Sequence, residues 1–194
     1  MIGFIGLTGG LGAGKSTALA ALERLGAATL SSDAVVHELY ETDEVRDLVV
    51  ERYGPDVLRS GEIDRPAVAQ RAFATPQDRA WLEEMLWPRV DAWIATWRRQ
   101  LEDRSPPPRA AVVEVPLLFE AGMEAAFDAT IAVVTDEQLR QQRANEREHQ
   151  ALIERTARQL SQAEKARRAT YVVFNDGTVA QLESKLSAIL DMLS

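Results

Sequence analysis

Apolar residues along the chain fall into five short blocks that alternate with longer segments of helical spacing. The blocks cover residues 1–7, 27–30, 110–115, 128–135 and 171–174. Each block is apolar or glycine over most of its length, as in a strand buried on both faces of a parallel sheet. Strands that alternate with helices predict a sheet covered on both sides. We therefore expect an α/β three-layer fold with a five-stranded parallel sheet.

Residues 43–103 break this alternation, because their apolar positions recur at helical spacing and no convincing strand is present. Asp64-Arg65-Pro66 opens one helix, and Thr75-Pro76 opens a long amphipathic one. At helical spacing its tryptophans are expected in the core rather than in a ligand stack; they are Trp81, Trp87, Trp93 and Trp97. We predict a helical acceptor domain over residues 43–104 and a nucleotide-binding core over residues 1–42, 105–139 and 169–194.

A glycine-rich loop follows the first predicted strand and precedes the first helix. Residues 9–16, GGLGAGKS, fit the P-loop pattern G-x-x-x-x-G-K-[ST]. Glycines let successive backbone N–H groups point inward as a nest for phosphate oxygens, Lys15 can reach the β- and γ-phosphates, and Ser16 can ligate Mg²⁺. A glycine-rich turn with an incidental lysine is the alternative. The residues predicted to bind the nucleotide here are Thr8, Gly9, Gly10, Leu11, Gly12, Ala13, Gly14, Lys15, Ser16 and Thr17.

Two carboxylates stand near the ends of predicted strands, where ligands bind in α/β sheets. Asp33 follows the second strand; it is either a helix cap or the acid that accepts the proton of an attacking hydroxyl. Glu114 lies near the end of the strand over residues 110–115. It is either a half-buried strand acid or the acid that helps to hold Mg²⁺.

The segment from Arg140 to Arg168 reverses the sign of the chain's charge. It holds eight Lys or Arg residues against four Glu, in a chain of net charge −8. It is either a solvated helix face or a lid over residues 140–168 whose arginines, with Arg140 and Arg143 as candidates, offset charge on the transferring phosphoryl group. Asn175 and Gly177, in an Asn-Asp-Gly turn, form a plain turn or pass close to an adenine.

Composition narrows the class of protein further. A net charge of −8 over 194 residues argues against broad nucleic-acid binding, and the absence of cysteine suits a reducing cytosol. We find no signal peptide, no apolar run of membrane-spanning length and no guanine-reading N-K-x-D pattern. The expectations are a cytoplasmic protein that binds neither membrane nor nucleic acid, and a monomer, with an oligomer left open.

Several motifs together resemble the dephospho-CoA kinase family over nearly the whole chain. LTGGLGAGKST at residues 7–17 resembles its P-loop, usually LTGG(I)GSGKS/T, and VPLLFE at residues 115–120 matches its V-P-L-L-x-E signature. Asp33 matches the second acid of its D-A-D. Further matches are Ile63-Asp64-Arg65, Ala72-Phe73 and Trp87-Pro88 in the acceptor domain, Arg155, Gln159, Lys165 and Ala169 in the lid, and the N-x-G of residues 175–177.

The resemblance implies that ATP phosphorylates the ribose 3′-hydroxyl of dephospho-CoA, the last step of coenzyme A synthesis. Asp33 would then be the general base, with Lys15, Mg²⁺ and the arginines Arg140 and Arg143 stabilising charge. The acceptor would lie against Pro116, Leu117, Leu118, Phe119, Glu120 and Trp87.

Three departures from the family pattern stand out. Ser31 replaces the first acid of D-A-D, Trp87 stands where a histidine is frequent, and residues 143–150 align poorly. Two other functions stay open: a P-loop kinase of another small hydroxylated metabolite or nucleoside, and a regulator that binds ATP without turnover.

Overall fold

The computed structural model describes residues 2–140 and 159–193. The chain divides into two compact units, one formed by Met1–Ser31 with Arg98–Ser194 and the other by Ser32–Trp97. We call them the sheet unit and the helical unit, and describe each by itself. The predicted division into core, acceptor domain and lid stays a prediction, and most of the predicted lid lies outside the described residues.

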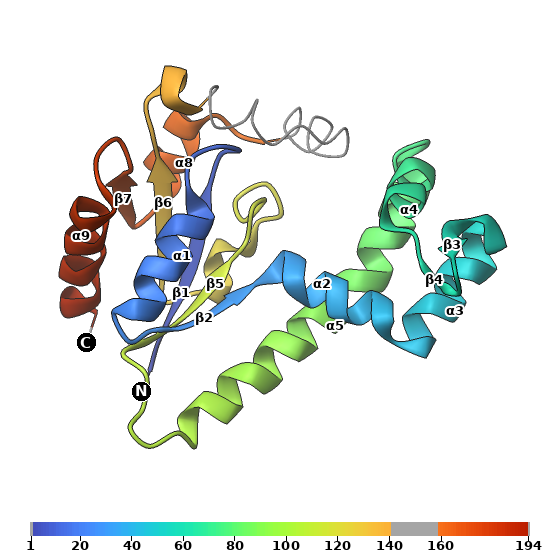
Figure 1. Cartoon of the computed structure of the whole chain (residues 1–194), viewed down its shortest axis with the longest axis horizontal. Helices are drawn as coiled ribbons and strands as arrows, with labels where there is room; N and C mark the ends of the chain where they lie inside the picture. The colour runs from blue at the N-terminus through green and yellow to red at the C-terminus, as the bar shows by residue number, and fades with distance from the viewer. Residues whose placement is uncertain (1, 141–158, 194) are drawn as a thin grey trace. The chain divides into compact units, whose positions relative to one another are not determined.

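The sheet unit is built on five parallel strands in the order β2-β5-β1-β6-β7 (Figure 1). All five predicted strands and the predicted fold class are confirmed. The strands are β1 Gly3–Gly9, β2 Ala28–Ser31, β5 Ala110–Glu114, β6 Ala129–Val134 and β7 Tyr171–Phe174. Because all five run the same way, their carboxyl ends meet at one edge of the sheet, where ligands bind in such folds.

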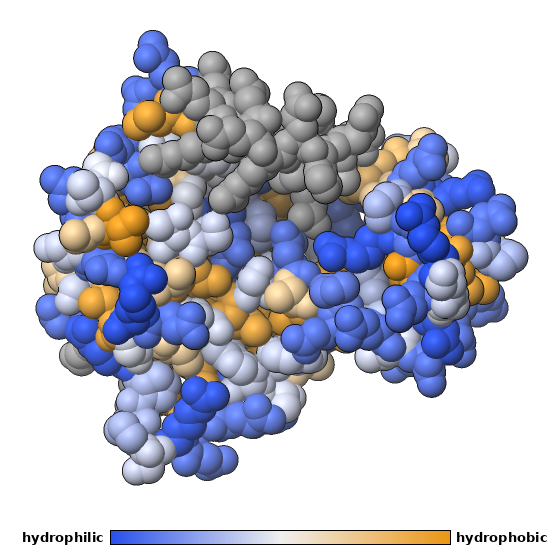
Figure 2. Space-filling view, viewed as in Figure 1, coloured by the Kyte–Doolittle hydropathy of each residue, from blue (hydrophilic) through white to orange (hydrophobic). Residues whose placement is uncertain are grey.

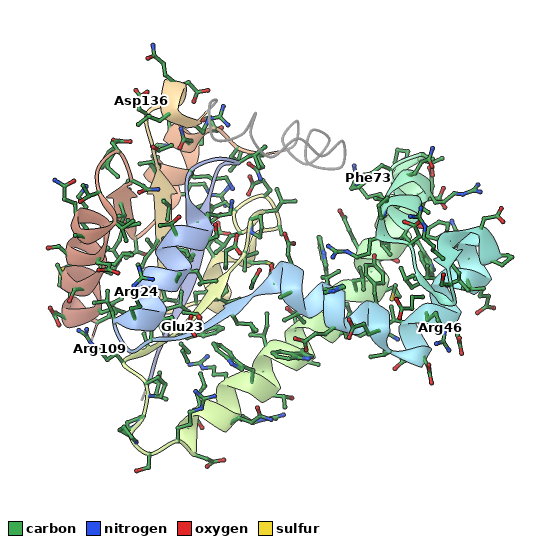
Figure 3. The ribbon with its side chains drawn as sticks, viewed as in Figure 1. Glu23, Arg24, Arg46, Phe73, Arg109 and Asp136 are labelled. Carbon is green, nitrogen blue, oxygen red and sulfur yellow. The ribbon has the colours of Figure 1, made fainter. Side chains whose placement is uncertain are left out.

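Each face of this sheet is covered by different segments. Helices α1 (Lys15–Arg24) and α9 (Val179–Met192) pack on one face and on each other. Leu22 and Leu186 are fully buried there beside Ile5, Leu7 and Ile131 of the strands. Side chains alternate along a strand, so Phe4 belongs to the opposite face, where its ring stacks on that of Phe127 with centroids 4.6 Å apart. Figure 3 shows Asp136 beyond the carboxyl end of β6, far from Arg24 and Arg109.

The helical unit contains α2 (Ser32–Glu41), α3 (Asp43–Tyr53), η1 (Pro55–Val57), α4 (Arg65–Ala72) and the first part of α5 (Pro76–Glu102). Asp64 caps α4, as its Asp-Arg-Pro sequence predicts, by accepting from the backbone N–H of Ala67. The core of this unit consists of Val45, Val49, Val57, Val68, Met85 and Leu86. Its outer surface in Figure 2 is mostly hydrophilic with small hydrophobic areas, as expected when amphipathic helices bury one face.

The prediction that residues 43–103 hold no strand is wrong. Strands β3 (Leu58–Arg59) and β4 (Glu62–Ile63) form a small antiparallel hairpin. Its turn residues Ser60 and Gly61 have φ of 55° and 87°, the left-handed conformation that two-residue hairpin turns of type I′ require. Strands of two residues are too short to leave an alternating pattern, so the periodicity could not reveal them.

The prediction that the four tryptophans belong to the core is wrong for Trp87 and correct in part for Trp81. Trp87 is 49% exposed, and none of the four is fully buried. The buried stripe of α5 consists of aliphatic residues and methionine: Met85, Leu86, Val90, Ile94 and Leu101. Trp81 packs beside the core of the helical unit and meets Tyr53 edge-on, with ring centroids 5.4 Å apart. Trp81 therefore borders the buried core, where an amphipathic ring can remain partly hydrated.

Even α5, with 27 residues, carries charges along its length. None of the helices in residues 2–140 and 159–193 is long and apolar enough to cross a membrane.

We predict that Gly6→Ala destabilises the sheet unit by about 1–3 kcal/mol, the usual cost of overpacking a core. A Cβ at Gly6 would lie 2.5 Å from Cδ1 of the fully buried Leu118 and 3.0 Å from the Phe127 ring. Gly3→Ala is the matched control on the same strand, since its nearest atom, the Leu193 carbonyl oxygen, is 3.7 Å away. Urea unfolding measures both; equal stability of the two variants would refute the prediction.

Candidate active site

The glycine-rich loop connects β1 to α1 at the carboxyl edge of the sheet. Gly12 and Gly14 have φ of 77° and 92°, which side chains other than glycine rarely adopt. A Cβ at Gly9 would lie 2.5 Å from the Val133 carbonyl oxygen, so this position is restricted to glycine by its close approach to β6. Within residues 2–140 and 159–193 no side chain caps the start of α1. The first N–H groups of a helix have no partner within the helix and can bind phosphate oxygens, and Ser16 in this turn is exposed.

Lys15 is the first residue of α1, and its side chain folds back over the loop. Its ammonium donates to the Gly10 carbonyl at 3.3 Å and lies 4.0 Å from Oε1 of Glu114. The other oxygen of Glu114, Oε2, accepts from the Ser31 hydroxyl at 3.0 Å. Each of three strand ends thus contributes one interacting group. Lys15 follows β1, Glu114 ends β5 and Ser31 ends β2.

A second lysine contacts Thr8, the residue immediately before the loop. Lys165 of α8 (Gln162–Arg168) is fully buried, and its ammonium donates to the carbonyl of Pro116 at 2.9 Å and to the Thr8 hydroxyl at 3.4 Å. It also forms an ion pair of 2.8 Å with Oε1 of Glu120, which accepts from the Leu160 N–H. Burial lowers the pKa of Lys165, and the hydrogen bond that its ammonium donates to Glu120 opposes that shift.

The VPLLFE segment thus turns several of its side chains inward. Leu118 is fully buried, Phe119 is nearly so, and Glu120 is engaged by Lys165. Arg168 stacks over the Phe119 ring at 4.9 Å from the centroid. The assignment of residues 116–120 to the acceptor stays a prediction. In the structure the segment joins α8 to the end of β1.

Further contacts reach the phosphate loop from the chain after β6. Arg140 donates to the Leu11 carbonyl at 3.2 Å and forms a bidentate pair with Glu137, which raises its pKa. The Gln159 side chain accepts from the Leu11 N–H at 3.2 Å. Asp136 caps the helical turn that begins at residue 137 by accepting from the N–H groups of Gln138 and Leu139. Arg143, the other candidate for phosphate binding, lies outside the described residues.

The Asn-Asp-Gly turn after β7 supports the loop from the other side. Asn175 is buried, and its side-chain amide donates to the Ala13 carbonyl at 3.0 Å. Asp176 accepts from the Thr135 hydroxyl at 2.9 Å and so joins this turn to the end of β6. The predicted adenine contact of Asn175 and Gly177 is untested, but a supporting contact to the phosphate loop exists that the sequence did not indicate.

Asp33 lies in the helical unit, in the first turn of α2, two residues beyond the end of β2. A carboxylate is favoured there by the positive end of the helix dipole. Its side chain is half-buried. Trp87, the other residue of this unit assigned to the acceptor, lies exposed on α5. Both assignments stay predictions.

Sequence reasoning placed Lys165 only within an expected lid. It did not predict that Lys165 is buried and contacts Thr8 and Glu120. Its neighbours in sequence are charged and polar, so the local pattern favours a solvated helix. Two signals single it out in the sequence: it matches the family's lid pattern, and it is the only lysine among the arginines of residues 140–168.

We predict that Lys165→Met lowers the free energy of unfolding by about 3 kcal/mol, because it leaves the partly buried Glu120 carboxylate without its cation. Lys165→Met/Glu120→Gln removes that uncompensated charge and keeps an acceptor for the Leu160 N–H. It should therefore regain part of the loss. Chemical denaturation near neutral pH measures both variants. If the double variant is no more stable than the single one, the ion pair does not explain the loss.

Comparison with known proteins supports one family. The family model described as dephospho-CoA kinase matches residues 3–181. The dephospho-CoA kinase of Protochlamydia amoebophila is 36% identical over 193 residues, with 97% of this chain and 95% of that protein covered. That of Deinococcus radiodurans is 38% identical over 192 residues, with 97% and 91% covered.

Solved structures agree. A crystal structure of a Thermus thermophilus protein superposes with a TM-score of 0.83 at 31% identity, covering 100% of this chain and 98% of that one. The dephospho-CoA kinase from Campylobacter jejuni has a TM-score of 0.68 at 23% identity, over 97% and 96% of the two chains, and supports the fold alone. The resemblance noted in the motifs is confirmed: the chain belongs to the dephospho-CoA kinase family of kinases.

Proposed function

We propose that this chain transfers the γ-phosphoryl group of ATP to the ribose 3′-hydroxyl of dephospho-CoA, giving coenzyme A and ADP. The observation that carries the proposal is the phosphate loop, with its uncapped helix start and with Lys15 held between Gly10 and Glu114. Membership of the family supports the identity of the acceptor. The proposed partners are therefore small molecules.

The donor half of the reaction rests on the sheet unit. Backbone N–H groups of the phosphate loop and of the first turn of α1 would donate to phosphate oxygens, and Lys15 would neutralise charge on the β- and γ-phosphates. Arg140 lies beside the loop, at the Leu11 carbonyl, and is proposed to add positive charge with Arg143. The adenine would lie against the turn that contains Asn175 and Gly177. These groups need little rearrangement, because Lys15 and Asn175 already contact the loop.

Magnesium fits the donor set at the same edge. The Ser16 hydroxyl and the Glu114 carboxylate would hold it; both are hard oxygen ligands. Within residues 2–140 and 159–193 no group of three or more His, Asp or Glu side chains could hold a metal. This agrees with an ion that takes most of its ligands from phosphates and water rather than from a protein cage. When bound, the ion would neutralise charge on the phosphates.

The acceptor half is assigned to Asp33, Trp87 and residues 116–120. Asp33 would orient the 3′-hydroxyl and accept its proton as the oxygen forms a bond to the γ-phosphorus. The bond from that phosphorus to the bridging oxygen breaks, and its electron pair leaves with ADP. Trp87 and the VPLLFE segment would contact the acceptor. Most of the rate would come from positioning and charge stabilisation.

We expect purified protein with ATP and Mg²⁺ to release ADP in the presence of dephospho-CoA. A coupled assay over dephospho-CoA, nucleosides and simple sugars measures it, with Lys15→Ala as the inactive control. Turnover with another alcohol but not with dephospho-CoA would favour a different small-molecule kinase. ATP binding without acceptor-stimulated turnover would favour a regulator. Either result would refute the proposed function.

Asp33→Asn should lower kcat by about 10²–10⁴-fold, the usual contribution of a positioned general base. The amide keeps the shape of the side chain but cannot take the proton. Glu38→Gln, an exposed acid on the same helix, is the matched control and should keep kcat. If Asp33→Asn stays within about tenfold of the unmodified protein, the general-base assignment is wrong.

A further inference from the structure

Ser31 stands where the family pattern has an acid, yet it is not a passive replacement. It ends β2 and is paired in register with Glu114 at the end of β5. Its hydroxyl donates to Oε2 of Glu114 at 3.0 Å. The register places the two residues side by side on neighbouring strands, so the sheet itself sets the distance between them.

The two oxygens of Glu114 face different partners. Oε2 is held by Ser31, while Oε1 lies 4.0 Å from the ammonium of Lys15. The side chains of Lys15 and Glu114 are only 13% and 14% exposed, so water screens them little. A carboxylate is planar, and a hydrogen bond to one oxygen therefore limits the directions in which the other can point. The Ser31 hydroxyl thus restrains a flexible glutamate at the edge of the phosphate loop.

We infer that Ser31 is a positioning residue of the donor half: it holds Glu114 so that the second carboxylate oxygen faces Lys15 and the phosphate loop. The inference rests on the proposed function, in which Glu114 helps to hold Mg²⁺ beside the nucleotide. Ser31 acts only through Glu114.

An acid at position 31 would do the opposite in this chain. An ionised aspartate side chain there is acceptor-only and cannot donate to Glu114. It would also place a second negative charge beside Glu114, at a separation the sheet fixes, and the like charges would push the carboxylates apart. Serine therefore suits a site in which a single glutamate carries the charge, and its role depends on the hydroxyl as a donor.

The test compares Ser31→Ala, Ser31→Thr and Ser31→Asp in the full chain. Binding of a non-hydrolysable ATP analogue is measured by calorimetry at several Mg²⁺ concentrations, and kcat and KM for ATP are measured separately. Loss of a hydrogen bond to a charged group should weaken Mg²⁺-dependent binding by about tenfold in Ser31→Ala and raise KM for ATP similarly. Ser31→Thr keeps the donor and should stay within about twofold. Thr29→Ala, two residues earlier on β2, is the control for disturbance of the strand.

The role through Glu114 is tested by a double-mutant cycle. In a Glu114→Ala background, Ser31→Ala should cause no further loss of Mg²⁺-dependent binding, because the group it positions is gone. Thermal unfolding checks that each variant is folded. Three results would overturn the inference: full binding by Ser31→Ala, additive losses in the cycle, or tighter binding by Ser31→Asp than by the unmodified protein.

Failure of the inference can be told apart from failure of the proposed function. If the unmodified protein does not phosphorylate dephospho-CoA, the proposed function fails, while coupling between Ser31 and Glu114 in analogue binding would still support the positioning role. If turnover is normal and the cycle is additive, the function stands and the inference fails.

Discussion

The buried ammonium of Lys165 holds together the segments that border the phosphate loop. Removal of a cation from water is tolerated only where polar partners replace its hydration, and Lys165 finds them on two segments that border the loop. Thr8 lies immediately before the loop, and Pro116 and Glu120 belong to the turn after β5. A shift of α8 would leave both Lys165 and Glu120 unpaired in a poorly hydrated place. The ion pair therefore restricts α8, β1 and the VPLLFE segment to one arrangement.

The fold was predictable from the sequence where the signal is local. Parallel strands buried on both faces leave continuous apolar blocks, and the P-loop pattern itself marks the turn from β1 to α1. The errors lie where local pattern is weak or ambiguous. The β3–β4 hairpin is too short to show alternation, and Trp87 shares helical spacing with the buried stripe although it is exposed. Periodicity assigns a side chain to a sector of the helix, not to a depth.

The candidate site was only partly predictable, because its supporting contacts join residues far apart in the chain. The amide of Asn175 reaches the Ala13 carbonyl across 162 positions, and Lys165 reaches Glu120 across 45. A sequence motif can mark the residues that face a ligand, as it did for Lys15. It cannot mark the residues that hold the motif in place, because their role arises from strand order and helix packing. This is why Asn175 was predicted as a nucleotide contact and not as a support.

The chain and its proposed ligand are both negatively charged, so the partners of the cations near the loop decide which cation can bind phosphate. The chain carries a net charge of −8, whereas a triphosphate requires positive charge. Three cations of the described residues near the loop have a carboxylate neighbour: Lys15 has Glu114, Arg140 has Glu137 and Lys165 has Glu120. The pairs differ in exposure, from the fully buried Lys165 to the partly exposed Lys15 and Arg140. Lys15 also has the longest of these three separations, 4.0 Å. Because Coulomb attraction weakens with distance, Lys15 can turn to phosphate at the smallest loss, while Lys165 is kept for structure.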